Sequence, residues 1–492
     1  MSASDVQYKR PEVKQLLPIY KMIRDVLAGP AAVKAAGPAY LPTPDPTDES
    51  EANKKRYAAY KLRAMFFDAT SRTHEGYIGQ MFYREPQIEL PPLLSVLEVD
   101  VDGTGVGLLQ QAKEASEDVL PLGRSGLFVD YSNKLGTNAS RADQEKFKVR
   151  PTITLYAPEN IINWRWTVVQ DQKFLSMVVL EEQYDASDNG YEICQATQWR
   201  ELRLVWDEVD EYGEPIGVPY YVSKIWREGE KGLYELPMAV PTRGDGKRWE
   251  YIPFYFIGSK NNDPLPDRPP FEGLAHLNIG HYRNSADYEE SVFMLGQPTP
   301  WASGITTNWL KEAWNNQLRL GSREFIPLPE NGNMGLLQPE PNTMAKEAME
   351  LKERQMVALG AKLAEQKQVQ ATATETNKES VIENSTLSTV AQNVSAAYQL
   401  ALTDCCIFSN ITDEVVFELN TDFEITRMTA QDRAQLMAEM QAGGITWAEY
   451  RWNMKRSGVA YEDDAKALRE KDAMMEEAAL DLDKQDPDPP EE

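Results

Sequence analysis

Two of the chain's three histidines lie close together, and this pair raises the question of a metal or acid–base site. The stretch Leu274 to Trp301 holds His276 and His281, and three carboxylates follow them, Asp287, Glu289 and Glu290. No proline interrupts residues 273–296, which predicts a helix. A five-residue spacing turns two rings about 140° apart around a helix, whereas the zinc motif on a helix needs a four-residue spacing. The sequence therefore predicts a long, partly buried helix here and no metal site.

Two glycine-containing motifs bring other chemistries into consideration. "DVDGTGVG" (Asp100 to Gly107) lacks the G-x-G-x-x-G spacing of dinucleotide loops, and the chain has no G-x-x-x-x-G-K-[ST] phosphate loop. Asp100 and Asp102 form a D-x-D pair that could hold a divalent ion, but no further ligands of EF-hand type follow. "GRSGL" departs from the nucleophile-elbow pattern because its second glycine follows Ser125 directly. We therefore interpret the first motif as a turn and predict no nucleophile in the second.

Composition narrows the class of protein. The chain has 492 residues, with 42% hydrophobic and 26% charged residues, which is enough for several globular domains. A net charge of −26 argues against sequence-independent DNA binding through a basic patch. Three cysteines, Cys194, Cys405 and Cys406, make no disulfide framework, so a reducing cytosol is the expected setting. The N-terminus has no signal-peptide pattern, and no apolar run is long enough for a membrane span.

The first half of the chain reads as helices followed by strands. Helical spacing of apolar residues covers 11–27, 51–83 with a break near Ser71, and 108–120. "GRSGLFVDY" (123–131) alternates like a strand. From Arg150 to Trp226 the period changes to two, which predicts antiparallel strands in a meander, and "WEYIPFYFIG" (249–258) adds another strand. We interpret five tryptophans of the strands as core and interface residues rather than the lining of a sugar cleft: Trp164, Trp166, Trp199, Trp206 and Trp226.

The second half is built around long helices. After the helix that ends at Gly296, residues 305–341 are short and mixed, with a helical turn at 308–318 and strands at 323–328 and 335–340. Residues 342–366 are strongly helical with a thin apolar stripe, which suits packing on one or two like helices. The stripe consists of Met349, Met356, Leu359 and Leu363.

A polar segment separates that helix from the next one. Residues 367–380 are rich in alanine and threonine, and Thr376 and Glu379 have the spacing of a capping box that would start a new helix. This helix carries a packing stripe of Val390, Val394, Ala397 and Ala401. A strand or hairpin at 414–425 and two helices within 429–459 follow, and the acidic, proline-ended C-terminus is expected to be disordered.

The order of these elements resembles that of bacteriophage portal proteins, and in particular a portal-like family found in tailed phages and prophages. The stretches that carry the resemblance are "YAPENIINWRW" (156–166), "IPFYFIG" (252–258), "LAHLNIGHYRNSADYEESVFMLGQPTPW" (274–301) and "ATATETN" (371–377). The resemblance runs from about residue 10 to about residue 460. It implies an α+β portal fold with the following parts: wing 1–270, first stem helix 271–300, clip 301–342, second stem helix 343–366, tunnel loop 367–378, long wing helix and strand 379–425, helical crown 426–475 and acidic tail 476–492.

The resemblance also implies a function without catalysis. Such a chain would form a ring, typically a dodecamer, at one capsid vertex of a virion assembled in the host cytoplasm. DNA would pass through its channel during packaging and ejection, and no cofactor or membrane would be needed. Its partners would be the large subunit of terminase, the major capsid and scaffold proteins, and neck, adaptor and tail proteins. Two alternatives are another virion protein, such as a head–tail adaptor, and an acidic-residue hydrolase of cell-wall sugars.

The implied sites are non-catalytic and contain no metal ligands. The DNA-facing tunnel loop would use Lys367, Gln368, Gln370, Thr372, Thr374, Thr376 and Lys378. The channel stem would present His281, Arg283, Glu347, Glu350, Glu353 and Arg354. The clip interface would use Trp301, Trp309, Trp314, Arg319 and Arg323. The stem carboxylates would either repel DNA from the wall of the bore or act as ordinary solvated helix charges.

Overall fold

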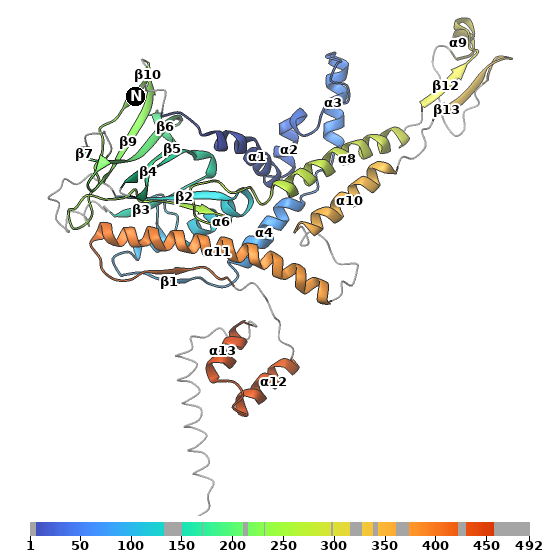
Figure 1. Ribbon diagram of the computed structural model, residues 1–492. Helices are drawn as coiled ribbons and strands as arrows, with labels where there is room; N and C mark the ends of the chain where they lie inside the picture. Colours follow the sequence, from blue (N-terminus) through green and yellow to red (C-terminus); the bar gives the residue numbers. More distant parts are fainter. Residues whose placement is uncertain are drawn as a thin grey trace, which may run out of the picture. The chain divides into compact units, whose positions relative to one another are not determined.

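Two separately packed units make up the chain, Met1–Thr421 and Asp422–Glu492. The computed structural model describes residues 6–131, 150–169, 171–209, 215–230, 232–296, 299–314, 327–337, 343–360, 373–421 and 430–456. The fold is a mixture of helices and antiparallel strands, as the change of sequence period predicts (Figure 1). The predicted tail at 476–492 lies outside the described residues.

The helices follow the apolar spacing of the sequence. Helix α1 begins with a proline, whose fixed φ suits the first turn of a helix, and buries Val13, Tyr20, Ile23 and Val26 along one face. In the first unit the described helices are α1 (Pro11–Leu27), α2 (Pro30–Ala36), α3 (Glu51–Arg63), α4 (Ala69–Met81), α5 (Val96–Val99), α6 (Leu108–Leu122), α8 (Glu272–Gly296), α9 (Thr307–Trp314), α10 (Met344–Ala358) and α11 (Ala373–Ser409). The second unit contains α12 (Ala430–Gln441) and α13 (Trp447–Arg456), the two helices expected there.

The strands form one large sheet and one smaller sheet, with three short pairs beside them. The large sheet has the order β10-β9-β6-β5-β4, and each neighbouring pair is antiparallel, which confirms the predicted meander. Its strands are β4 (Ile161–Val169), β5 (Gln172–Asp188), β6 (Ile193–Val205), β9 (Tyr220–Gly229) and β10 (Gly232–Glu235). The smaller sheet has the order β11-β2-β3, formed by β2 (Arg124–Tyr131), β3 (Pro151–Tyr156) and β11 (Phe254–Gly258). The pairs are β1 (Gln87–Glu89) with β14 (Val416–Glu418), β7 (Glu208–Val209) with β8 (Pro215–Ile216), and β12 (Thr299–Ser303) with β13 (Asn333–Leu337).

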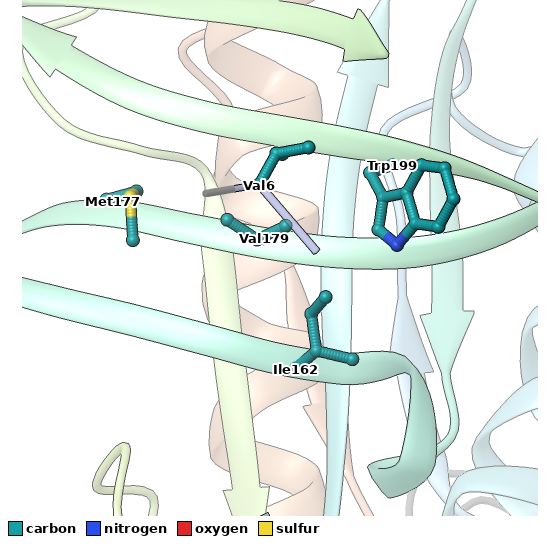
Figure 2. Packing of buried hydrophobic residues seen from close by; sticks show 5 residues of the cluster. All are labelled: Val6, Ile162, Met177, Val179 and Trp199. Carbon is teal, nitrogen blue, oxygen red and sulfur yellow. The ribbon is translucent and has the colours of Figure 1, made fainter. Parts of the chain in front are cut away.

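Buried apolar side chains cover both sheets. On the large sheet Val6 packs against four strand residues, and the five side chains form a buried cluster: Val6, Ile162, Met177, Val179 and Trp199 (Figure 2). Trp226 and Leu233 pack against this cluster. Helix α11 packs on β2, β3 and β11 of the smaller sheet, and it also packs against α6. The predicted stripe of α11 is buried as expected, with Val390 and Val394 at 0% exposure. Among the strand tryptophans Trp164 and Trp199 lie in the core, while Trp166 is 40% exposed.

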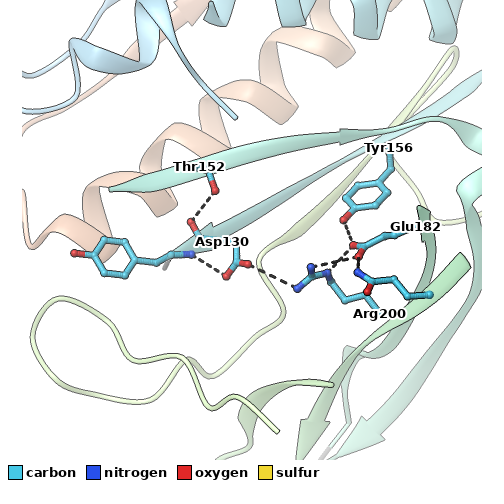
Figure 3. A network of polar contacts seen from close by, with 7 residues as sticks. Asp130, Thr152, Tyr156, Glu182 and Arg200 are labelled. Carbon is cyan, nitrogen blue, oxygen red and sulfur yellow. Dashed lines mark hydrogen bonds and ion pairs between the residues drawn. The ribbon is translucent and has the colours of Figure 1, made fainter. Parts of the chain in front are cut away.

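A buried polar network joins the two sheets (Figure 3). Arg200 on β6 donates from Nε to Glu182 Oε1 of β5 at 2.6 Å. Tyr156 on β3 donates to the same oxygen at 2.5 Å, and Gln198 donates to the other oxygen at 2.7 Å. Asp130 on β2 lies 3.8 Å from the Arg200 guanidinium. Burial works to raise the pKa of Glu182, but Arg200 and these hydrogen bonds outweigh it and hold that pKa below its ordinary value.

Several predicted boundaries are wrong, and each error has a local reason. The break between α3 and α4 falls at residues 64–68 rather than near Ser71, because Met65 and Phe67 bond through their backbone to side chains of α8. Strand β12 includes Pro300, which was expected only to stop a helix; β13 is its single partner in the pair, so an edge position tolerates the missing N–H. The strand predicted at 323–328 lies largely outside the described residues.

Two boundaries of the long helices also differ from expectation. Helix α10 ends at Ala358 rather than at residue 366. Gly360 follows with φ 109°, a backbone conformation that favours glycine, and a Cβ there would come within 2.5 Å of the Tyr77 hydroxyl unless that side chain shifted. Helix α11 begins at Ala373 and not at the Thr376 capping box, since nothing in residues 373–378 interrupts a helix.

Candidate functional site: the α8–α10 helix pair

Helices α8 and α10 lie side by side and antiparallel (Figure 1). Close approaches at two levels fix the direction, because Lys352 of α10 lies against Gly280 and Leu359 lies against Gly273. Helix α10 turns one narrow face inward, with Met356 fully buried and five half-buried residues, Ala345, Ala348, Met349, Lys352 and Val357. The thin apolar stripe of the sequence therefore packs on a like helix, although Leu359 of that stripe is 57% exposed.

The predicted channel residue His281 faces the inside of this pair. Its side chain is 7% exposed, and its Nε2 lies 3.0 Å from Glu353 Oε1 of α10. The Phe67 ring packs at 5.5 Å from the imidazole. His281 and Glu353 therefore join the two helices, and Glu353 still keeps 47% of its side chain exposed. The channel role expected for both residues stays a prediction. His276 is exposed, and the described residues contain no cluster of three or more acidic, histidine or cysteine side chains that could hold a metal.

The carboxylates that follow the histidines anchor α8 to α3. Tyr60 donates to Asp287 Oδ1 at 2.6 Å, and Arg63 forms an ion pair with Glu290. Nearer the start of α8, Asn278 accepts from both the backbone N–H and the hydroxyl of Thr70. These contacts answer the question that the sequence raised, because the acidic residues hold a helix in place.

The remaining stem residues lie on the surface. Glu347, Glu350 and Arg354 are exposed and share the face of α10 that points away from α8, since they lie roughly 100–160° from Met349 at about 100° per residue. Arg354 donates to the Glu350 backbone oxygen at 3.3 Å. Arg283 is exposed on α8 but donates to the Tyr40 carbonyl at 2.7 Å.

The predicted clip residues lie in the insert between the two helices, as far as the structure describes it. Trp301 is 43% exposed on β12 and pairs with Gly335 of β13. Trp309 and Trp314 belong to α9, an eight-residue helix that lies between the two strands in the sequence. Arg319 and Arg323 lie outside the described residues.

The predicted tunnel loop is described only in part. Lys367, Gln368, Gln370 and Thr372 lie outside the described residues. Thr374, Thr376 and Lys378 lie in the first turns of α11, so for these three the expected loop is wrong in its backbone conformation. Their role toward DNA stays a prediction.

The two glycine motifs have structural roles. Asp100 accepts from the backbone N–H groups of Gly103 and Gly105 at 2.8 and 3.1 Å and forms an ion pair with Arg150, which is the predicted turn. Ser125 is fully buried in β2. Neither motif therefore offers an open reactive group.

A buried carboxylate that sequence reasoning missed holds α11 against β11 and the segment before it. Asp404 is 1% exposed and accepts from the hydroxyls of Tyr251 and Tyr255 at 2.5 and 2.6 Å. Burial raises its pKa to about 6, although the two hydrogen bonds pull the pKa partly down. No local signal marks this residue, because its partners come from a segment some 150 residues earlier in the chain.

Asp404 should make stability depend on pH. Its folded pKa lies above its ordinary value, so the folded state binds the extra proton and stability falls as the pH rises from about 4 to about 6. We expect the free energy of unfolding of Asp404→Asn, relative to the native chain, to rise by roughly 2–3 kcal/mol across that range. Urea unfolding at several pH values measures this. Asp413→Asn, which alters an exposed carboxylate nearby, is the control; equal pH profiles for all three proteins would contradict the prediction.

Comparison with known proteins places one family over this part of the chain. Residues 270–407 match the family described as a domain of unknown function, DUF4055. Among solved structures, a chain of "Neck of empty GTA particle computed with C6 symmetry" is 13% identical, with a TM-score of 0.41 over 80% of this chain and 91% of that chain. No curated protein matches. The family description names no activity, and a structural overlap of this size carries no function across.

No helix in the described part of the chain is long and apolar enough to cross a membrane.

Proposed function

We propose that this chain is a portal protein of a tailed-phage-like particle. Copies of it form a ring at one vertex of a capsid, and DNA enters and leaves through the channel along the ring axis. The ring is a structural and docking component without catalysis. The dodecamer that the sequence resemblance implies is part of this proposal.

The observation that carries the proposal is the antiparallel pair α8–α10 with its inserted module. The pair is internally tied by His281–Glu353, and the Asp287 and Glu290 contacts anchor the C-terminal half of α8 to α3. Between the two helices the described residues form β12, α9 and β13. A rigid two-helix leg that ends in a small module is suited to line a bore in many copies and to present the module at one end of it.

Surface chemistry supports the same reading. The outward face of α10 bears Glu347, Glu350 and Arg354, so it is hydrated and acidic on balance. The chain carries a net charge of −26, and a ring multiplies that charge. Like charges repel DNA phosphates, which lets a duplex slide without sticking. Exposed apolar side chains near the far end of α8, Val292, Phe293 and Met294, offer packing surface for neighbouring copies.

The further assignments follow the order of the chain. The insert around Trp301 and Trp309 docks terminase during packaging and neck, adaptor or tail proteins afterwards. The segment 367–378 touches DNA in the bore, with Lys367 and Lys378 as its cations. The unit Asp422–Glu492 forms the crown. Capsid and scaffold proteins surround the first unit.

Electron microscopy of the purified full-length protein tests the proposal. We expect rings of identical subunits with an axial hole wide enough for a DNA duplex. Sedimentation velocity over a wide concentration range gives the mass of the ring. A protein that stays monomeric at every concentration would contradict the proposal.

A further inference from the structure

The β5–β6 hairpin extends beyond the body of the large sheet. Strand β6 pairs with β9 only from Gln198 onward, and no third strand pairs with residues 185–195 in the part of the chain that the structure describes. All side chains from 185 to 195 are exposed. A two-stranded hairpin alone is marginally stable in water, so a projection of this kind gains from a partner.

The tip of this hairpin is a hydrogen-bonded turn that presents a tyrosine. Gly190 has φ 84°, and Asp188 accepts from its N–H at 2.7 Å. Asn189 accepts from the backbone N–H groups of Tyr191 and Glu192 at 2.9 and 2.8 Å. Tyr191 is 101% exposed and Ile193 is 53% exposed. A preformed turn that holds an aromatic ring in water resembles the rigid anchors that dominate protein interfaces.

The opposite end of the same sheet carries an apolar cavity of about 250 Å³. It lies near the β4–β5 turn, where Trp166 pairs with Leu175, and it extends to α11 at Ala397 and Leu400. Trp166 and Leu400 are 40% and 50% exposed, so the cavity opens to solvent. Its volume is below the roughly 300 Å³ at which small-molecule sites begin, which favours one inserted side chain over a ligand.

The charges of the two ends are complementary. No lysine or arginine occurs from Glu181 to Trp199, and the tip carries Asp185, Asp188 and Glu192. The rim of the cavity carries Lys173, whose Nζ lies 4.9 Å from the Trp166 ring. Exposed carboxylates also lie near the cavity, Asp171 in the turn and Asp263 between the lining residues Asn262 and Pro264, so Lys173 is the cation that complements the tip.

The tip cannot reach the cavity of its own chain. Strand β5 runs from Gln172 to Asp188, and at about 3.3 Å per residue its two ends are roughly 50 Å apart. A knob at one end of a sheet and a hole at the other are the two different surfaces that a head-to-tail ring contact needs.

We propose that the hairpin tip of one copy inserts Tyr191 into the cavity beside Trp166 and Leu400 of the next copy around the ring. This inference rests on the proposed ring and names one of its contacts. The acidic tip meets Lys173 at the rim, and the neighbouring copy supplies the support that the free hairpin lacks.

Cysteine cross-linking in full-length protein tests the contact. The exposed Cys194 is first changed by Cys194→Ser, while Cys405 and Cys406 are buried. With both Tyr191→Cys and Leu400→Cys in one chain, we expect a ladder of covalent multimers on non-reducing gels. A mixture of the two single variants should give covalent dimers only, and each single variant alone should give none. Dimers from Tyr191→Cys alone would show a tip-to-tip contact and overturn the inference.

Equilibrium assembly provides a second readout. We expect Tyr191→Ser to raise the concentration at half-assembly by at least about tenfold, as for a central interface tyrosine. Val99→Ser, which changes another side chain that is 73% exposed, should leave that concentration within about twofold. Intact rings with no cross-link and no effect of Tyr191→Ser would overturn this contact but keep the ring. A native chain without rings would overturn both proposals.

Discussion

Replacing Arg200 by methionine is expected to destabilise the first unit by about 3–5 kcal/mol at neutral pH. Arg200 is 19% exposed, and its partner Glu182 is 13% exposed. The substitution leaves the Glu182 carboxylate buried without its cation, while Tyr156 and Gln198 still hydrogen-bond to it. Equilibrium unfolding in urea, followed by tryptophan fluorescence, measures the loss.

Two comparisons separate the buried charge from lost packing. Adding Glu182→Gln to Arg200→Met should recover part of the stability, because the uncompensated charge disappears. Arg248→Met is the matched control. Its ion pair with Asp207 is exposed on both sides, so that change should cost less than about 1 kcal/mol.

The destabilisation caused by Arg200→Met should change with pH in a defined direction. In the native chain the pKa of Glu182 is lowered, so its stabilising contribution is present above its ordinary pKa and is lost as the pH falls through the folded pKa. The penalty of Arg200→Met should therefore be largest near neutral pH and should shrink on acidification. A penalty that is constant with pH would show that packing, rather than the charge, carries the effect.

Met356→Asp is expected to separate α10 from α8 and to abolish ring formation. Met356 is 1% exposed on the inward face of α10, near its C-terminal end, and a buried carboxylate there costs more than about 3 kcal/mol. The large sheet does not depend on the packing of α10 against α8 and should stay folded. Hydrogen exchange followed by mass spectrometry should show loss of protection in α8 and α10, with β4, β5 and β6 unchanged.

The matched control is Gln355→Asp, which introduces the same charge at the next position, where the side chain is exposed. It should keep the amide protection of α10. Electron microscopy of the two variants then reads out assembly directly. Rings of native appearance from Met356→Asp would contradict the view that a closed helix pair is the structural unit of the channel.

Much of the fold follows from local pattern. The bounds of α8 agree with the prediction to within a few residues, because its ends are marked by proline and glycine and nothing inside it opposes a helix. The meander of β4, β5, β6 and β9 follows from the period of two. The buried stripe of α11 follows from its small and β-branched residues at helical spacing.

Less of the candidate site could be predicted from the sequence. Spacing correctly separated His276 from His281, but it could not show that His281 would meet Glu353, which lies 72 residues later. The same limit applies to the end of α10. The sequence analysis predicted a helix through Gly360, whereas the structure gives this residue a positive φ and places it beside Tyr77 of α4.

By itself, the sequence determined the class of fold, the succession of helices and strands, the acidic surface and the narrow stripe of α10. The tertiary structure decided which face of each helix is covered, that Asp404 is buried between two tyrosines, and that Tyr191 and the Trp166 cavity lie at opposite ends of one sheet. The physical reason is the separation along the chain over which each effect acts. Periodicity and capping act over a few residues, whereas burial and the pairing of charges depend on which distant segments come together.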